Sequence, residues 1–360
     1  MANWAIIVGI NEYRGLPESD WLHGAVADAS DFADWALHPQ GGAVDADKAF
    51  IWTFPAPPAT PTEPHGAMSL SAPWPDLGSV PSATRAPDAT RPPDAVDIVA
   101  LVEMVKDLAY AAPGPHRIYV FFAGHGIQIT GRDGETCFVV GDYKGVANFG
   151  LIPCDALRGT LQTTGFEEVV LFLDCCRTLI NWRGQAPNVF VDGAGHQVRY
   201  AVGRAAERQK MAFEFPAQPP KRGAFTKALT EALRRKRDAN GGLTLGDLEL
   251  YVQGRVPGLL GSNLQLPQFE PDPRPWPHPL ITGPAIDPVS RVVIPGVPAG
   301  VRLQLFDSND APVGPPQPAA VDGYIRFDAA VVGDMYSVRR DTGEVLKNFR
   351  HEGEAPLDVF

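Results

Sequence analysis

The sequence is poor in cysteine and has no long apolar run. Only four of its 360 residues are cysteine, at positions 137, 154, 175 and 176. Their number and spacing match neither a disulfide framework nor a zinc site, which favours a reducing, cytoplasmic setting. No apolar stretch approaches the roughly 18 residues that a membrane-spanning helix needs. The N-terminus also lacks the basic start and the cleavage site of a secretory signal, so we expect residues 6–10 to form a buried strand.

Positive charge is scarce as well. The chain has 31 basic and 42 acidic residues and a formal net charge of −11, which argues against nucleic acid or an anionic membrane as the main partner. A basic substrate suits this charge better. The sequence contains no phosphate-binding P-loop, no dinucleotide-binding glycine motif and no H-E-x-x-H zinc motif, so nothing specific indicates a nucleotide or zinc enzyme.

Proline, by contrast, is abundant and unevenly placed. Eleven of the 36 prolines fall within residues 54–94, among Ala, Ser and Thr and without apolar periodicity, which is typical of an inserted extended segment. A second cluster at 267–288 separates two regions of different pattern. We therefore predict a first domain over 1–275, a linker over 276–288 and a second domain over 289–360.

The pattern before the linker alternates between strands and helices. Strands are predicted from continuous apolar runs at 4–10, 49–53, 118–123, 169–173 and 209–215. Amphipathic helices are predicted at 24–37, 96–108 and 224–237. This alternation indicates an α/β fold with a mostly parallel sheet covered on both faces by helices. After the linker, short alternating runs at 301–305, 324–327 and 335–338 predict a small all-β, sandwich-like domain.

Reactive side chains follow two of the predicted strands directly. One strand runs into Gly124-His125-Gly126 and another into Asp174-Cys175-Cys176. The carboxyl ends of parallel strands share one edge of the sheet, where ligands bind. An imidazole there could take the proton of a thiol and activate it as a nucleophile. The backbone N–H groups of Gly126 and Cys176 are candidates to hold the oxyanion of acyl transfer.

These motifs resemble the caspase and metacaspase clan of cysteine peptidases. The histidine lies 51 residues before Cys176, close to the spacing of about 50 residues in the caspase signature. Residues 4–13, 22–29 and 223–229 resemble the first strand, the following helix start and a later helix of metacaspase-like enzymes. The resemblance covers about residues 1–275 and implies a caspase-like fold for that part of the chain.

The resemblance also implies roles for single residues. It places the nucleophile at Cys176, with His125 as the base, and leaves Cys175 as a packing neighbour. It makes Asp174, with Asp28 as a second acid, the substrate-binding pocket for the residue before the cut bond. Two carboxylates would select Arg or Lys, because a guanidinium can pair with carboxylate through two hydrogen bonds. From the residues alone, Asp174 could instead cap a turn, and Asp28 could be a solvated helix residue.

Two departures from the family pattern matter. Caspases that cut after Asp have Gln where this chain has Asp174, which supports basic specificity, and Arg177-Thr178 replaces the residues that usually follow the nucleophile. The long segment 179–207 contains Arg183, Arg199 and Arg204. By analogy, the stretch over 177–222 could be a linker that the enzyme cuts itself, although some relatives work uncleaved.

The sequence thus predicts a cysteine endopeptidase that acts on protein or peptide substrates and cuts after Arg or Lys. The alternatives are a caspase-type enzyme that cuts after Asp and an inactive caspase-fold scaffold that binds partners. The C-terminal β domain is expected to dock a partner or substrate. Related metacaspases often depend on calcium, but no cofactor and no metal ligands can be assigned here. A role in bacterial cell death or phage defence follows from resemblance alone.

Overall fold

The structure, a computed structural model, divides the chain into two compact units, Met1–Pro284 and Ala285–Phe360. The division falls inside the expected linker. In the first unit it describes residues 1–55, 68–69, 91–129, 135–143, 150–163, 165–180, 198–215, 221–238, 240–276 and 279–286. In the second it describes residues 292–294, 297–298, 300–306, 310–313, 315–318, 325–327 and 335–350. Most of the expected insertion 54–94 lies outside these residues.

A seven-stranded sheet forms the centre of the first unit, in the order β14-β10-β8-β4-β1-β2-β3. All neighbouring pairs are parallel except β10 with β14. The strands are β1 (Ala2–Ile10), β2 (Val44–Phe54), β3 (Met68–Ser69), β4 (His116–Ala123), β8 (Phe166–Asp174), β10 (Arg199–Arg204) and β14 (Gln268–Pro271). The expectation of a mostly parallel sheet is confirmed.

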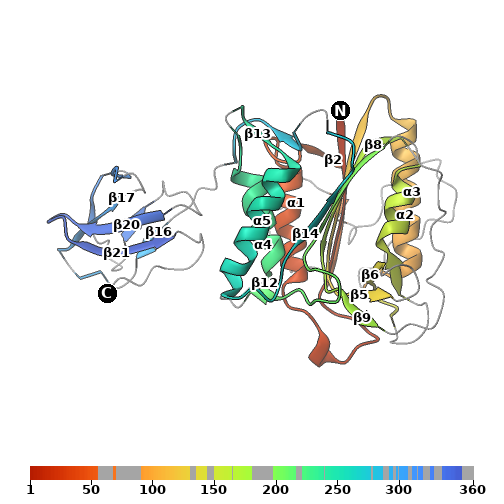
Figure 1. The fold of residues 1–360 in the computed structure, drawn as a ribbon, viewed down its shortest axis with the longest axis horizontal. Coiled ribbons are helices and arrows are strands. Elements are labelled where there is room, and N and C mark those ends of the chain that lie inside the picture. Colours follow the sequence, from red (N-terminus) through yellow and green to blue (C-terminus); the bar gives the residue numbers. More distant parts are fainter. Residues whose placement is uncertain are drawn as a thin grey trace. The chain divides into compact units, whose positions relative to one another are not determined.

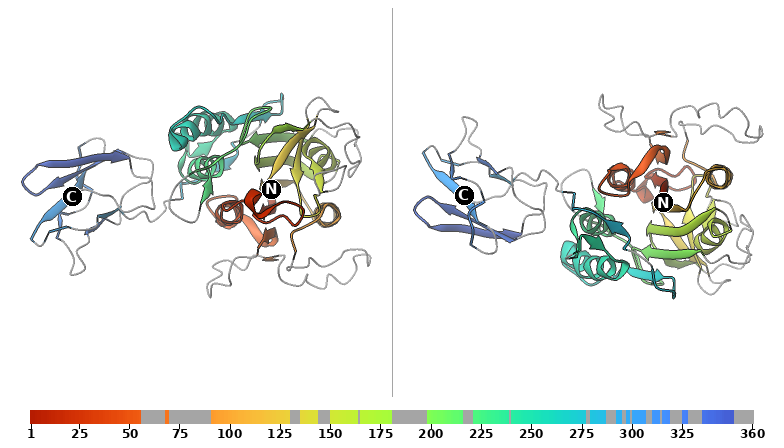
Figure 2. Two further views of the ribbon diagram at one scale, coloured as in Figure 1. Left: turned by 90° about the horizontal axis from the view of Figure 1, so that it is seen from below. Right: turned by 90° about the horizontal axis from the view of Figure 1, so that it is seen from above.

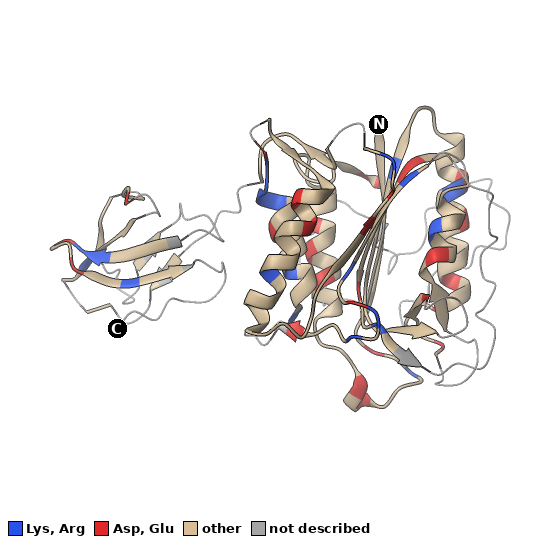
Figure 3. Cartoon of the chain, viewed as in Figure 1, with Lys and Arg blue, Asp and Glu red and all other residues tan. Residues whose placement is uncertain are grey.

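Helices cover both faces of this sheet (Figure 1). They are α1 (Ala25–Leu37), α2 (Ala95–Ala111), α3 (Cys154–Leu161), α4 (Ala224–Arg235) and α5 (Leu245–Leu260). One face carries α1, α4 and α5, and the other carries α2 and α3, an arrangement that is also visible from below and from above (Figure 2). Acidic and basic residues share the helices of both layers, so in this view the negative charge is not gathered on one helix (Figure 3).

The sequence explains why these elements form. The central strands β4 and β8 are buried along almost their whole length, which suits their continuous apolar runs. Helix α2 begins with a capping box, in which Asp94 and Asp97 each accept a hydrogen bond from the other's backbone N–H, at 2.9 and 3.0 Å. Helix α4 turns the apolar face expected from its spacing into the core, where Phe225 and Leu229 are fully buried.

Short strands build the ends of the unit. A four-stranded sheet, in the order β7-β6-β5-β9, extends from the carboxyl ends of β4 and β8. Its strands are β5 (Gly126–Ile129), β6 (Thr136–Val139), β7 (Leu151–Pro153) and β9 (Thr178–Ile180). Elsewhere lie the 3-10 turn η1 (Glu18–Asp20) and two pairs, β11 (Glu214–Phe215) with β12 (Arg222–Gly223) and β13 (Gly242–Leu243) with β15 (Ile281–Thr282).

The prediction of a fifth strand over 209–215 is wrong. The strand beside β8 is β10, and most of 209–215 is a loop in which Gln209 has a positive φ of 63°. The prediction selected strands by their apolar content, and it missed β10 because that strand begins and ends with arginine. The charge of Arg204 is paired with Glu270 at 2.8 Å, and Tyr200 packs under the Arg158 guanidinium at 4.3 Å. Such tertiary compensation leaves no trace in local sequence.

The second unit is all-β, as the alternating pattern predicts. Strands β16 (Val292–Ile294) and β19 (Ile325–Phe327) form one antiparallel pair. Strands β17 (Arg302–Phe306), β18 (Gln317–Pro318), β20 (Met335–Arg340) and β21 (Val345–Arg350) form a four-stranded antiparallel sheet in the order β18-β17-β20-β21. Both sheets contribute to one apolar core, in which Ile294, Leu303, Leu305 and Val338 are fully buried.

Candidate active site

The carboxyl ends of β4 and β8 bring the two expected reactive residues to the same level of the sheet. Ala123 pairs with Asp174 where these strands end, and beyond them Ile127 of β5 pairs with Thr178 of β9, again in parallel. Both pairs are 51 residues apart (174 − 123 and 178 − 127), and so are His125 and Cys176 (176 − 125). His125 lies between β4 and β5, and Cys176 lies between β8 and β9. Because adjacent strands are about 4.8 Å apart, the shared register places these two residues next to each other.

The His125 ring is held from two sides by the segment that follows β1. Its Nε2 lies 2.6 Å from the backbone oxygen of Asp20 in η1. A carbonyl oxygen only accepts, so Nε2 carries the proton and Nδ1 is left as the free base. Burial lowers the pKa of His125, against the opposing effect of the Asp20 carbonyl. The imidazole is therefore neutral near pH 7 and ready to accept a proton.

Tyr13 fixes the backbone of the same residue. Its fully buried hydroxyl accepts a hydrogen bond from the backbone N–H of His125 at 2.8 Å, and the two rings lie 4.8 Å apart between centroids. A Cβ on Gly124 would lie only 2.5 Å from the Tyr13 hydroxyl, so this contact requires glycine before the histidine. Tyr13 thus positions the turn that carries His125.

The Cys176 thiol faces the loop over 209–213, within the range whose apolar residues predict a strand. Its Sγ accepts a hydrogen bond from the backbone N–H of Ala212 at 3.3 Å and lies 3.6 Å from the Ala212 oxygen. Burial raises the pKa of Cys176, and the Ala212 N–H partly offsets that effect. The residue rests as a thiol, so it needs a base to become a nucleophile.

The neighbouring cysteine has a different environment. Cys175 is fully buried, and burial raises the pKa of its thiol strongly. Its Sγ fills the space beside Gly126, where an added Cβ would lie 2.6 Å from that sulfur and 2.6 Å from the Cys176 oxygen. The geometry agrees with Cys175 as packing and with glycine at 126. The assignment of the Gly126 and Cys176 amides as oxyanion donors stays a prediction.

The two expected acids come together from distant parts of the chain. Asp174 ends β8 and Asp28 lies in the first turn of α1, and both are buried. Gly223 joins them, because its N–H donates to Asp28 Oδ2 at 2.8 Å and an added Cβ would collide with Asp174 Oδ2. Thr226 donates to Asp174 Oδ2 through its N–H at 3.0 Å and its hydroxyl at 2.6 Å.

Burial and mutual repulsion disfavour the charged forms of these carboxyls. Burial raises the pKa of Asp174 to about 6. Burial, and then the charge of Asp174, raise the pKa of Asp28 well above its usual value. The Asp28 Oδ1 atom is buried and accepts no hydrogen bond from any described residue. Both groups would gain from a cationic partner.

A third acid, which sequence reasoning missed, lies with them. Glu214, beside the Ala212 loop, accepts hydrogen bonds through Oε1 from the N–H groups of His23 at 2.8 Å and Gly24 at 2.5 Å, and its charge adds to the rise in the pKa of Asp174. It is about 190 residues from its partners along the chain, so no local motif reveals it. The Asp20 carbonyl was missed because a backbone group has no sequence signature.

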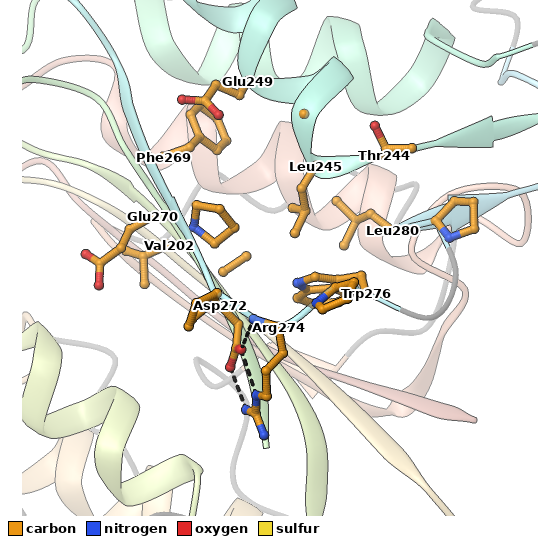
Figure 4. Close-up of a pocket in the computed structure, with 16 residues that line it drawn as sticks. Val202, Thr244, Leu245, Glu249, Phe269, Glu270, Asp272, Arg274, Trp276 and Leu280 are labelled. Atoms are coloured by element: carbon orange, nitrogen blue, oxygen red, sulfur yellow. Dashed lines mark hydrogen bonds and ion pairs between the residues drawn. The ribbon is translucent and has the colours of Figure 1, made fainter. Parts of the chain in front are cut away.

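A cavity lies away from these strand ends. It has a volume of about 660 Å³ and lies beside β14 and the start of α5, with Phe269, Trp276 and Leu280 among its walls (Figure 4). The charges of Arg274 and Asp272 are paired with each other at 2.6 Å (Figure 4). None of the site residues expected from sequence lines this cavity.

Neither a membrane-spanning helix nor a metal-binding cluster occurs in the part of the chain that the structure describes. No helix there combines the length and apolar character needed to cross a membrane. No three His, Cys, Asp or Glu side chains in these segments converge in a way that could hold a metal ion, so no calcium ligands are assigned.

Comparisons with known proteins identify the family of the chain. The caspase domain family matches residues 2–274. A probable protease of a Desulfuromonadales bacterium is 26% identical over 251 residues, which make up 65% of this chain and 26% of that protein. The matched part therefore spans about a quarter of that relative's length.

Two solved structures are similar at lower identity. A protein of Geobacter sulfurreducens is 15% identical with a TM-score of 0.47, over 79% of this chain and 98% of its own. Caspase-1 of Spodoptera frugiperda is 13% identical with a TM-score of 0.42, over 74% of this chain and 87% of its own. The family match alone covers well over half of the chain and includes both reactive strand ends. The chain belongs to the caspase-domain family of cysteine peptidases.

Proposed function

We propose that this chain is an endopeptidase that cuts peptide bonds after Arg or, less well, Lys. The observation that carries the proposal is that the buried carboxyl groups of Asp28 and Asp174 meet at Gly223, beside the strand ends that bear His125 and Cys176. Glu214 of β11 pairs with the same glycine across the ladder to β12. A guanidinium between these acids would replace repulsion by paired hydrogen bonds.

The chemistry follows from the protonation states of the resting pair. His125 Nδ1 takes the proton from Cys176 Sγ, and the thiolate attacks the substrate carbonyl to form a tetrahedral intermediate. Backbone N–H groups at Gly126 and Cys176 hold its oxyanion. The intermediate collapses to a thioester while the imidazolium gives its proton to the leaving amine. Water, deprotonated by His125, then releases the acid product and restores the thiol.

The acidic residues at the strand ends also favour the proposal over its alternatives. An aspartate side chain of a substrate would enter a region of like charge and meet repulsion from Asp174 and Glu214, which disfavours cleavage after Asp. An inactive scaffold would have no need of a neutral imidazole at the level of a half-buried thiol. The retained pair favours an active enzyme.

The test is hydrolysis of fluorogenic peptides that differ only in Arg, Lys or Asp before the reporter. We expect cleavage after Arg, its loss in Cys176→Ala, and its retention in the matched variant Cys175→Ala. Asp174→Asn should reduce kcat/KM for the Arg peptide by about tenfold or more, since it removes a charge-assisted hydrogen bond. Cleavage after Asp would contradict the pocket assignment but keep the dyad.

Self-processing is a further part of the proposal. Arg199 and Arg204 belong to β10 inside the central sheet, and Arg204 is buried, so cuts there would break the fold. Arg183 lies outside the described residues and is the candidate. Purified wild type should yield two fragments that Arg183→Ala and Cys176→Ala do not, as intact-mass measurement would show. An uncut, fully active wild type would remove self-processing from the proposal.

The cell-death or defence role and the docking role of the C-terminal unit rest on resemblance and on modular architecture. Expression in bacteria of wild type beside Cys176→Ala tests the first role. Toxicity that depends on Cys176 would support it, and equal growth of both strains, with and without phage, would count against it.

A further inference from the structure

A charged cavity adjoins the residue that follows the nucleophile. Its volume is about 480 Å³, and four arginines line it, namely Arg158, Arg177, Arg204 and Arg208. Arg177 and Arg204 are more than nine-tenths buried, with exposed fractions of 4% and 7%. Cavities with several buried guanidinium groups are unusual, because an unpaired buried charge is costly.

Arg177 has only neutral partners among the described residues. Its Nε donates to Thr136 Oγ1 at 2.9 Å, and its Nη1 donates to the Ala206 oxygen at 3.2 Å and to Gln268 Oε1 at 2.7 Å. Nη2 makes no hydrogen bond with this part of the chain. Burial, and then the nearby charges of Arg204 and Arg208, lower the pKa of Arg177 to about 10. The guanidinium lacks a counter-ion.

The four carboxylates that line the cavity contact groups other than Arg177 and Arg208. Glu270 binds Arg158 at 3.0 Å and Arg204 at 2.8 Å, and Asp155 lies 3.5 Å from Arg204. Glu135 accepts from the N–H of Ala156, and Glu249 accepts from Gln253. Arg208 is exposed and forms no ion pair with a described residue. Four arginines and four carboxylates thus line the cavity, but no ion pair joins Arg177 or Arg208 to a carboxylate of the described residues.

We propose that a small, multiply charged oxyanion binds in this cavity between Arg177 and Arg208. Phosphate-type and dicarboxylate ligands share the required chemistry, which is several acceptor oxygens with at least two negative charges. With a net charge of −11, the rest of the chain offers little general attraction for anions, so binding would be specific to this cavity.

The site is connected to the catalytic loop, and this step rests on the proposed peptidase function. Arg177 directly follows Cys176, and its N–H donates to the Lys210 oxygen at 2.9 Å. Arg208 lies on the same loop, which continues to Ala212 at the thiol and Glu214 at the acidic pocket. An anion held by both arginines would fix this loop in the position that forms the substrate site.

Binding is measured by calorimetry and thermal unfolding with inorganic pyrophosphate, inorganic phosphate and succinate at constant ionic strength, with sulfate as the competing anion. We expect pyrophosphate to raise the unfolding midpoint by at least about 2 °C. Arg208→Gln should bind it at least about tenfold more weakly, because a charge-assisted contact is lost. Lys210→Gln removes the same charge from the same loop outside the cavity and should bind normally.

Each outcome of these measurements either supports or contradicts anion binding in this cavity. Pyrophosphate binding that exceeds succinate assigns the site to phosphates, and the reverse assigns it to dicarboxylates. Equal binding in Arg208→Gln and wild type, binding no stronger than that of sulfate, or no binding would overturn it. Arg208→Lys, which keeps the charge but not the forked donor, gives a second variant if Arg208→Gln unfolds.

The catalytic link has its own readout. In wild type the ligand should raise kcat/KM for the Arg peptide several-fold, and in Arg208→Gln it should not. Binding without any such change would overturn the link to the loop. Failure of all peptides to be cleaved would contradict the peptidase function, while the calorimetric result would still decide the anion site.

Discussion

At the scale of single residues, the site depends on contacts that place the two reactive groups rather than on those groups alone. Tyr13 accepts the backbone N–H of His125, and without the hydroxyl this buried donor would lose its partner. We expect Tyr13→Phe to lower kcat about tenfold with little change in KM, because it displaces the imidazole but not the substrate pocket.

The matched control is Tyr119→Phe. Tyr119 is equally buried, and its hydroxyl accepts from Arg117 at 3.0 Å far from the strand ends. Both variants should lose comparable stability, whereas only Tyr13→Phe should slow the reaction. Equal kcat in the two variants would show that Tyr13 stabilises the fold without positioning the base.

Replacing Asp174 by Asn is expected to raise the stability of the fold and to lower the activity. Its pKa is about 6 in the folded protein and near 3.9 in the unfolded chain. A raised carboxyl pKa means that the folded state holds the proton more tightly, so stability is lost as pH rises from about 4 to about 6. Asp174→Asn should therefore raise the free energy of unfolding at pH 7 by roughly 1–3 kcal/mol, with no difference below about pH 3.

The same substitution should weaken cleavage of Arg peptides, and in wild type kcat/KM should rise as pH increases through about 6 as Asp174 ionises. Urea unfolding at pH 3 and pH 7, beside a pH profile of hydrolysis, checks both effects. A destabilised Asp174→Asn at pH 7 would contradict the idea that the carboxylate is held there for binding.

At the scale of elements, Asp28 of α1 and Asp174 of β8 can come together because Gly223, at the start of α4, has no side chain. A Cβ on Gly223 would collide with Asp174 Oδ2 and lie 2.9 Å from Asp28 Oδ2. We expect Gly223→Ala to destabilise the protein by about 2 kcal/mol or more and to abolish Arg cleavage. Gly159→Ala in α3, where an added Cβ meets nothing within 4 Å, should instead be neutral or stabilising.

The elements also show which parts of the molecule the sequence could predict. Strands β4 and β8 are buried on both faces, so their apolar runs identified them, and the motifs at their ends identified His125 and Cys176. Strand β10 was missed because Arg199 and Arg204 find partners only after folding. Asp28 and Asp174 were suggested by family resemblance, but Glu214 and the Asp20 carbonyl depend on contacts between distant loops, which no local pattern contains.

At the scale of the whole molecule, the two units have separate apolar cores, and every described residue of the site belongs to Met1–Pro284. Catalysis of short peptides should then need only the first unit. We expect a chain that ends at Pro284 to keep its unfolding midpoint and its kcat/KM for a short Arg peptide within about twofold of the full chain, as independent domains do.

Protein substrates provide the contrasting measurement. If Ala285–Phe360 docks them, the shortened chain should cut a basic protein substrate more slowly than the full chain, through a higher KM at unchanged kcat, because docking raises the local concentration of the substrate. Substitution of Leu305 by Asp in the full chain, at a fully buried position of the second core, should reproduce this loss by unfolding that unit alone. Equal KM values for the protein substrate in all three chains would mean that the second unit has no part in substrate capture, and would leave the first unit as the whole of the peptidase.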